Sequence, residues 1–258
     1  MHYAPAPTTP DHHKTRRLVV VSNRTASGGQ GRAGGLAVAL AEAVRERGGL
    51  WFGWSGTLSD TISAPRLVRD GGIDFALTDL TPAEHEGYYF GYANRVLWPL
   101  FHYRTDLAQA DGAAFETYEA VNRRFARQLA PLLRPDDIVW VHDYHLIPLA
   151  RELRAAGWRG TTGFFLHIPF PAPEVFSALP QHARLARTLA DYDLVGFQTE
   201  QDAGNFRGYL ARRRGALTAA RVAEAPRREP RIGVFPIGID PGEIDALLRT
   251  RSARETEA

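Results

Sequence analysis

The sequence predicts an α/β fold built on a Rossmann-like, doubly wound and mostly parallel sheet. Short apolar, β-branched runs alternate with segments of helical periodicity along the 258 residues, and this alternation is typical of a parallel sheet with helices on its faces. Several runs are apolar throughout, as strands buried on both faces are. Titratable residues directly follow two of these runs, at the strand ends where an open α/β sheet binds ligands.

The first half of the chain begins with a β-branched strand, followed by a glycine-rich loop and a helix that a glycine pair ends. A second strand and one or two further strands come next, then a polar loop, and then a long helix whose apolar residues keep helical spacing. In order, these elements are expected at residues 17–23, 24–35, 36–47, 50–54, 65–79, 86–89 and 113–133.

The second half predicts four more strands, each an apolar run that follows a helix or a breaker such as Pro135. These strands are expected at residues 138–141, 163–166, 192–198 and, as the final strand of the chain, 231–236. Helices are expected at 146–156, at 174–189 with an interruption at Pro180, at 200–212 and from 242 onward, with an irregular arginine-rich stretch at 212–230. Residues 1–15 are expected to form a disordered tail and 246–258 a charged tail, which leaves one domain at 16–245.

Composition excludes several classes of function. The chain has no cysteine, which excludes disulfides, thiolate catalysis and cysteine metal sites. A net charge of +2 gives no reason to expect nucleic acid as a partner. No apolar run approaches the roughly 20 residues that span a bilayer, and the N-terminal residues lack the apolar core of a signal peptide. We therefore expect a cytoplasmic protein that does not bind membranes.

The glycine-rich loop formally matches a dinucleotide-binding pattern at Gly29, Gly31 and Gly34. Such glycines let backbone amides approach a phosphate at a helix N-terminus. The second strand, however, ends in Phe52-Gly53-Trp54-Ser55 without the acid that would hold a ribose. A flexible loop that holds some anionic ligand is therefore favoured over a nicotinamide site.

Four titratable residues after two strands could suggest a metal cluster; they are His142, Asp143, His145 and His167. Strand alternation opposes this, because His142 and Asp143 should point to opposite faces. Each histidine can equally be a hydrogen-bonded structural residue. Asp143 can face a ligand cleft, since a buried carboxylate needs a partner, or it can cap the next helix. No metal and no cofactor are expected.

Several longer segments resemble the trehalose-6-phosphate synthase family of retaining GT-B glycosyltransferases. The resemblance covers most of residues 17–242, in the family's order. The segments that carry it are LVVVSNR (18–24), GGLAVAL (34–40), GGLWFGWSG (48–56), YYFGYANRVLWPLFHYR (88–104), VWVHDYHLIPLARELR (139–154), FFLHIPFPAPEVFSALP (164–180), DYDLVGFQTE (191–200) and VFPIGIDP (234–241). The resemblance implies the N-terminal half of a GT-B fold, and transfer of glucose from UDP-glucose or another nucleotide-glucose to glucose 6-phosphate in trehalose biosynthesis.

The resemblance also implies roles for individual residues. The acceptor, glucose 6-phosphate, would be bound by Arg24 and Tyr89 at its phosphate, by Trp54 and Trp98 as pocket walls, and by Asp143 at its hydroxyls. The donor would be bound by Gly34 and Gly35 at the diphosphate and by His167 at the sugar. No protein nucleophile is expected, because in the family the leaving phosphate is thought to take the acceptor's proton on the same face, with retention.

The resemblance further implies that the second, nucleotide-sugar-binding domain of a GT-B enzyme is absent from these residues. A separate chain could supply that domain. We therefore expect weak binding of glucose 6-phosphate and negligible turnover by this chain alone. A non-catalytic sugar-phosphate-binding or interaction module of the same fold is the main alternative, and an NAD-dependent oxidoreductase is a third.

Overall fold

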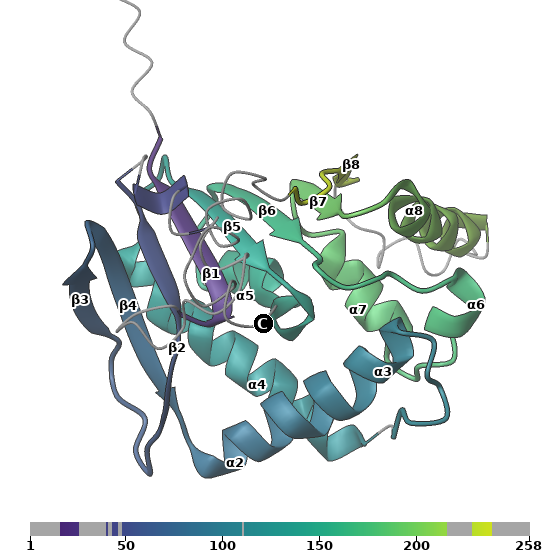
Figure 1. The fold of residues 1–258 in the computed structure, drawn as a ribbon, viewed down its shortest axis with the longest axis horizontal. Coiled ribbons are helices and arrows are strands. Elements are labelled where there is room, and N and C mark those ends of the chain that lie inside the picture. The colour runs from purple at the N-terminus through teal and green to yellow at the C-terminus, as the bar shows by residue number, and fades with distance from the viewer. Residues whose placement is uncertain are drawn as a thin grey trace, which may run out of the picture.

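The computed structural model describes residues 16–25, 40, 43–45, 48–109, 111–215 and 229–238. Its strands form one sheet, which Figure 1 shows with helices packed around it. The strands are β1 (Leu18–Arg24), β2 (Leu50–Leu58), β3 (Arg66–Asp70), β4 (Ile73–Leu80), β5 (Ile138–His142), β6 (Thr161–Phe165), β7 (Leu194–Phe197) and β8 (Arg231–Val234). Every strand expected from the sequence is present, and residues 65–79 contribute two.

Within the described residues the strand order is β3-β4-β2-β1-β5-β6-β7-β8. All neighbours pair in parallel except β3 and β4, which form an antiparallel pair at one edge. The chain therefore builds outward from β1 in both directions, first towards β2 and later towards β5. The predicted mostly parallel sheet is confirmed, and its topological switch point lies between β1 and β5, where an α/β sheet binds ligands.

Successive residues of β1 pack into two separate cores, as the alternation of side chains along a strand requires. Val19 and Val21 belong to the larger core, whereas Leu18 and Val20 belong to the smaller one on the other face. Leu40, in the segment expected to be helical at 36–47, packs into this smaller core. Of that segment, residues 40 and 43–45 are described, and they are helical.

The helices expected at 113–133, 146–156, 174–189 and 200–212 are present with differences in length, and the structure adds helices between residues 82 and 101. They are α2 (Pro82–Glu84), η2 (His85–Leu97), α3 (Trp98–Phe101), α4 (Gly112–Leu129), η3 (Ala130–Leu132), η4 (Tyr144–Leu146), α5 (Leu149–Ala155), α6 (Pro173–Phe176), α7 (His182–Leu189) and α8 (Glu200–Gly215). The expected interruption at Pro180 separates α6 from α7.

The prediction of a polar loop at residues 86–89 is wrong. These residues belong to η2, a π-helix that continues α2 and leads into α3. Thr81 and Glu84 form a complete capping box at the start of α2, which is a sequence signal for a helix N-terminus. Tyr88 and Tyr92, four residues apart, are fully buried, so the apolar side of this helix is part of the larger core.

The predicted tails at 1–15 and 246–258, the helix from 242 and most of the arginine-rich stretch lie outside the described residues. Among the described helices, none has the length and apolar character needed to cross a membrane.

Candidate functional site

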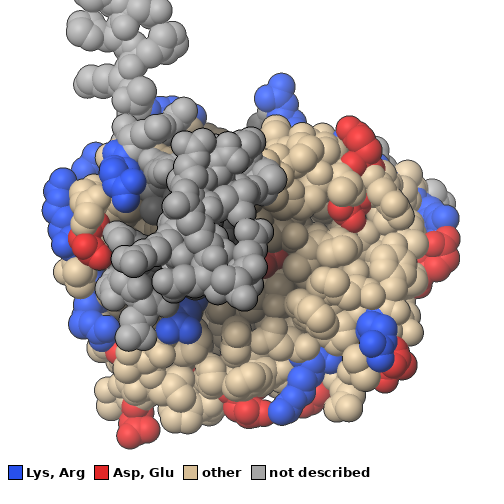
Figure 2. All heavy atoms as spheres, in the orientation of Figure 1, with Lys and Arg blue, Asp and Glu red and all other residues tan. Residues whose placement is uncertain are grey.

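Three predicted site residues lie at the carboxyl ends of strands beside the switch point. Arg24 is the last residue of β1, Asp143 directly follows β5, and His167 comes two residues after β6. β1 pairs with β5 and β5 with β6, so these three positions lie along one edge of the sheet. In Figure 2 the middle of the molecule is hollowed beside the grey atoms, and much of the exposed surface around it carries no charge.

Arg24 is an exposed cation held over an aromatic ring. Its guanidinium carbon lies 5.8 Å from the ring centre of Trp54, a distance at which a cation is attracted to a ring face. The guanidinium also lies against Gly56, where a Cβ would come within 2.8 Å of Nη2. Trp54 is fixed in turn by donating its Nε1–H to the carbonyl of Thr57 at 2.8 Å. These neighbours therefore restrict the orientation of the guanidinium, and its N–H donors stay accessible.

Tyr89 joins Trp54 to the loop after β5 through a series of ring contacts. The ring centres of Tyr89 and Trp54 are 5.9 Å apart. The rings of His85 and His145 lie almost parallel to Tyr89, at 5.3 and 5.6 Å. His145 packs against Tyr144 at 4.0 Å. These contacts restrict the orientation of Tyr89, whose ring also contacts Trp54, the residue beneath Arg24.

Asp143 has a strained backbone, with φ of 74° and ψ of 167°. This region is nearly restricted to glycine, and a residue held there costs about 1–3 kcal/mol. Its carboxylate accepts a hydrogen bond from the backbone N–H of His167 at 3.3 Å. Its side chain makes no capping hydrogen bond to the following helix, so the helix-cap interpretation is wrong. Such strain is typical of functional sites, where surrounding structure holds a side chain in place.

Burial raises the pKa of Asp143 to about 6, because a carboxylate loses hydration when protein surrounds it. Asp143 is nonetheless partly exposed, so a ligand can reach it. Above that pKa it is a carboxylate with unused hydrogen-bond acceptors, and below it a neutral acid. A carboxylate of this kind suits the hydroxyl groups of a bound sugar.

The three histidines near Asp143 are all neutral at pH 7. Burial lowers the pKa of His142 well below its usual range, that of His145 to about 3 and that of His167 to about 4. His142 is hydrogen-bonded, as a structural histidine is, and its partner is His167. Neither ring nitrogen of the buried His145 has a hydrogen-bond partner among the described residues. No group of three or more potential metal ligands occurs in the part of the chain that the structure describes.

Trp98 lies at the start of α3, with 44% of its surface exposed. Its ring centre is 4.2 Å from that of His102, and His102 donates its Nδ1–H to the carbonyl of Trp98 at 2.7 Å. A positive charge on His102 would lower the pKa of Asp143, which places this pair near the carboxylate. The exposed indole face is therefore available as a wall of the site.

The structure thus joins Arg24, Trp54 and Tyr89 through ring contacts, and Asp143 to His167 through a hydrogen bond. Gly34 and Gly35 lie outside the described residues. The roles that the resemblance gives to these residues stay predictions. Sequence reasoning missed His85 and His102. His85 lies four residues before Tyr89 and His102 four residues after Trp98, so a helix assigned over residues 85–101 would have placed each histidine beside its aromatic neighbour.

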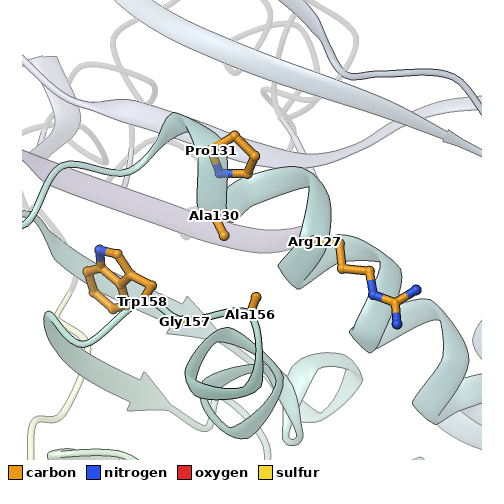
Figure 3. A pocket seen from close by; sticks show the side chains of 6 residues that line it. All are labelled: Arg127, Ala130, Pro131, Ala156, Gly157 and Trp158. Carbon is orange, nitrogen blue, oxygen red and sulfur yellow. The ribbon is translucent and has the colours of Figure 1, made fainter.

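A separate surface hollow of about 540 Å³ lies at the opposite edge of the sheet from these strand ends. It is lined by Arg127, Ala130, Pro131, Ala156, Gly157 and Trp158. Figure 3 shows Trp158 and Arg127 at opposite ends of it, with small side chains between them. These residues precede β5 and β6, so the hollow lies at the amino edge of the sheet. It contains none of the predicted site residues.

The arrangement on the carboxyl edge can be compared with known proteins. The sequence profile of glycosyltransferase family 20 matches residues 11–258. The chain belongs to glycosyltransferase family 20. Trehalose-6-phosphate synthase of Klebsiella pneumoniae, one similar member, is 48% identical over 241 residues, which are 92% of this chain and 50% of that protein.

Solved structures of this family agree with the fold. The α,α-trehalose-phosphate synthase (UDP-forming) of Burkholderia vietnamiensis superposes with a TM-score of 0.86 and 43% identity, over 95% of this chain and 54% of that one. The Burkholderia xenovorans enzyme in complex with glucose-6-phosphate gives a TM-score of 0.82 at 43% identity, over 93% and 55%. An Escherichia coli structure described as bound with UDP-2-fluoro glucose gives 0.82 at 46%, over 91% and 51%.

The family 20 chain therefore has the Rossmann-like architecture of the N-terminal half of a GT-B glycosyltransferase, as the sequence predicted. It spans about half the length of the curated relatives that it matches.

Proposed function

We propose that this chain is the acceptor-binding half of a retaining glucosyltransferase that forms trehalose 6-phosphate from glucose 6-phosphate and UDP-glucose. The observation that supports the proposal best is the exposed guanidinium of Arg24, which has no ion-pair partner among the described residues and lies over Trp54, whose ring contacts Tyr89. An anion is the natural ligand of such a cation. Relatives named for the same synthesis, one solved with glucose-6-phosphate, support the identity of that anion.

Arg24 would bind the acceptor phosphate through two parallel N–H donors, because the guanidinium fork matches two phosphate oxygens. Tyr89 would donate its phenolic O–H to the same phosphate. Its orientation is held by His85 and His145, so little side-chain freedom would be lost on binding. Gly56 leaves space for the guanidinium in this position, since a Cβ there would displace it.

Asp143 would accept hydrogen bonds from hydroxyl groups of the acceptor sugar, with Trp98 against its apolar surface. The pKa of about 6 means that the side chain is mostly ionised at neutral pH and can act only as an acceptor there. It would orient the attacking hydroxyl rather than remove its proton permanently. Orientation of two reactants can by itself account for several kcal/mol of a reaction barrier.

His167 would contact the sugar of the donor as a neutral hydrogen-bonding group. The diphosphate of the donor would supply the base that takes the acceptor's proton, so this half of the enzyme contributes binding and orientation. Because these substrates are charged sugar phosphates, which do not cross membranes freely, we also propose a cytoplasmic location.

Titration of glucose 6-phosphate into the ¹⁵N-labelled chain tests the acceptor site through its tryptophan indole N–H signals. We expect the signals of Trp54 and Trp98 to shift. Those of Trp51, which packs in the smaller core, and Trp158, at the amino edge, should not. Arg24→Gln should weaken binding about 10- to 150-fold, because hydrogen bonds to charged groups contribute about 1.5–3 kcal/mol.

The matched control is Arg69→Gln, which removes a cation on β3 whose side chain is 75% exposed. It should leave the affinity unchanged. Equal binding by the wild type and Arg24→Gln, or shifts confined to Trp51 and Trp158, would contradict the acceptor site. A shift caused by NADH and not by glucose 6-phosphate would instead favour an oxidoreductase.

A UDP-release assay with UDP-glucose and glucose 6-phosphate tests the reaction. We expect little release by these residues alone, and an increase when a C-terminal half of a family 20 relative is added. Binding of glucose 6-phosphate without any release under either condition would favour a non-catalytic sugar-phosphate-binding module. Rapid synthesis of trehalose 6-phosphate by the chain alone would show that these residues suffice for donor binding.

A further inference from the structure

The imidazoles of His142 and His167 contact each other at the carboxyl edge of the sheet, next to Asp143. His142 is the last residue of β5, and its Nδ1 lies 2.9 Å from Nε2 of His167. The two ring centres are 5.2 Å apart, with 26° between the planes. The ring of Trp140 packs on His142, with 4.3 Å between the ring centres, and the ring of Phe165 packs on His167, with 4.7 Å between them. Both rings are therefore held in place by packing as well as by the hydrogen bond.

Each of the two imidazoles has a single N–H proton, because both rings are neutral at pH 7. One of these two protons lies in the hydrogen bond between the rings. Burial lowers the pKa of each ring below neutrality, and a charge on His167 would lower that of His142 further. A neutral imidazole has one N–H and one bare nitrogen. Either His142 donates from Nδ1 to a bare Nε2 of His167, or His167 donates from Nε2 to a bare Nδ1 of His142.

The second nitrogen of His142 decides between these arrangements. His142 is 1% exposed, and its Nε2 is buried with no hydrogen-bond partner among the described residues. If His167 were the donor, the His142 proton would have to be on this Nε2, as a buried N–H without an acceptor. Orphaned buried N–H groups are rarer than under-satisfied buried acceptors, so the proton of His142 belongs on Nδ1.

We propose that His142 is a positioning residue that fixes the tautomer of His167 by donating Nδ1–H to its Nε2. His167 must then have its own proton on Nδ1, the nitrogen that His142 leaves available to a ligand. The partly exposed His167 thus offers a donor rather than an acceptor. Hydroxyl and phosphate oxygens accept such a bond. That this ligand is the sugar of a nucleotide donor rests on the proposed function; the tautomer does not.

The tautomer can be measured on the ¹⁵N-labelled chain by long-range proton–nitrogen correlation of the imidazole rings at pH 7. We expect His142 and His167 both to be protonated at Nδ1 and bare at Nε2. His142→Asn should keep the His167 tautomer, because the amide nitrogen can occupy the place of Nδ1 and donate. His142→Phe removes the donor, and the His167 proton should move to Nε2, the site that a free imidazole favours in water.

His182→Gln, on α7, is the matched control and should leave both signals unchanged. A His167 ring protonated at Nε2 in the wild type would overturn the inference even if the Phe variant failed to fold. So would a His167 tautomer that stays the same in a folded His142→Phe protein. When a C-terminal half of a family 20 relative is added, UDP-glucose should also shift the His167 Nδ1–H signal. The expected tautomer without that shift, and without UDP release in the same complemented mixture, would refute the proposed donor and leave the role of His142 intact.

Discussion

Replacement of Asp143 by asparagine should stabilise the fold at neutral pH. Asparagine keeps a carbonyl oxygen that can accept from the His167 N–H, and it removes the charge whose burial raises the pKa from 3.8 to about 6. Each pKa unit corresponds to 1.36 kcal/mol, so the ionised carboxylate destabilises the folded state by at most about 3 kcal/mol. Because Asp143 is partly exposed, we expect a gain of about 1–3 kcal/mol in the free energy of unfolding.

The pH dependence of this gain identifies its cause. A carboxyl group whose pKa is raised on folding binds more protons in the folded state, so stability falls as pH rises between the unfolded and folded pKa values. The destabilisation by the ionised carboxylate is absent below pH 3.8 and complete above about pH 6. The gain from Asp143→Asn should therefore be largest at pH 7.5 and fall to roughly half at pH 5.

Urea unfolding followed by tryptophan fluorescence, at pH 5 and 7.5, measures the gain. Asp193→Asn is the matched control: the Asp193 carboxylate accepts from Thr162 N–H at 2.8 Å and from Arg154, so its loss should destabilise the chain by about 1–3 kcal/mol. A loss of stability in Asp143→Asn, or a gain equal at both pH values, would refute the reasoning. Asparagine should also weaken glucose 6-phosphate binding, since it cannot accept as many hydroxyl hydrogen bonds.

Three further substitutions test the packing of the sheet and its helices, and urea unfolding measures each of them. Gly53→Ala should destabilise the chain by about 1–3 kcal/mol, because its Cβ would lie 2.3 Å from the carbonyl oxygen of Ser22. Gly204→Ala, in α8 with nothing within 4 Å, should instead stabilise it by roughly 0.5–1 kcal/mol; equal effects would contradict the steric argument. Asp137→Asn should cost about 3 kcal/mol, since the fully buried carboxylate pairs with Arg17 at 2.6 Å. An unchanged urea midpoint would show that this ion pair contributes nothing.

Most strands could be predicted from the sequence because their signal is local. A run such as Leu18–Val21 is apolar at every position, and the structure explains this by packing its residues alternately into two cores. The helix at 85–97 was missed for the opposite reason. Glycine and polar residues at 86–87 weaken the helical pattern, and burial of Tyr88 and Tyr92 against α4 supplies the stability that local propensity does not.

The sequence by itself determined which groups lie at the strand ends: a guanidinium on the last residue of β1, a carboxylate after β5 and an imidazole after β6. That follows from short-range patterns, since each strand end is set by its own neighbours in the chain. Only the tertiary structure decided what these groups can do. The strain and raised pKa of Asp143, the stacking of His145 on Tyr89 and the contact between His142 and His167 all arise where segments 24 or more residues apart come together. Burial and hydrogen-bond partners depend on that packing, so protonation state, tautomer and orientation could not be predicted from the sequence.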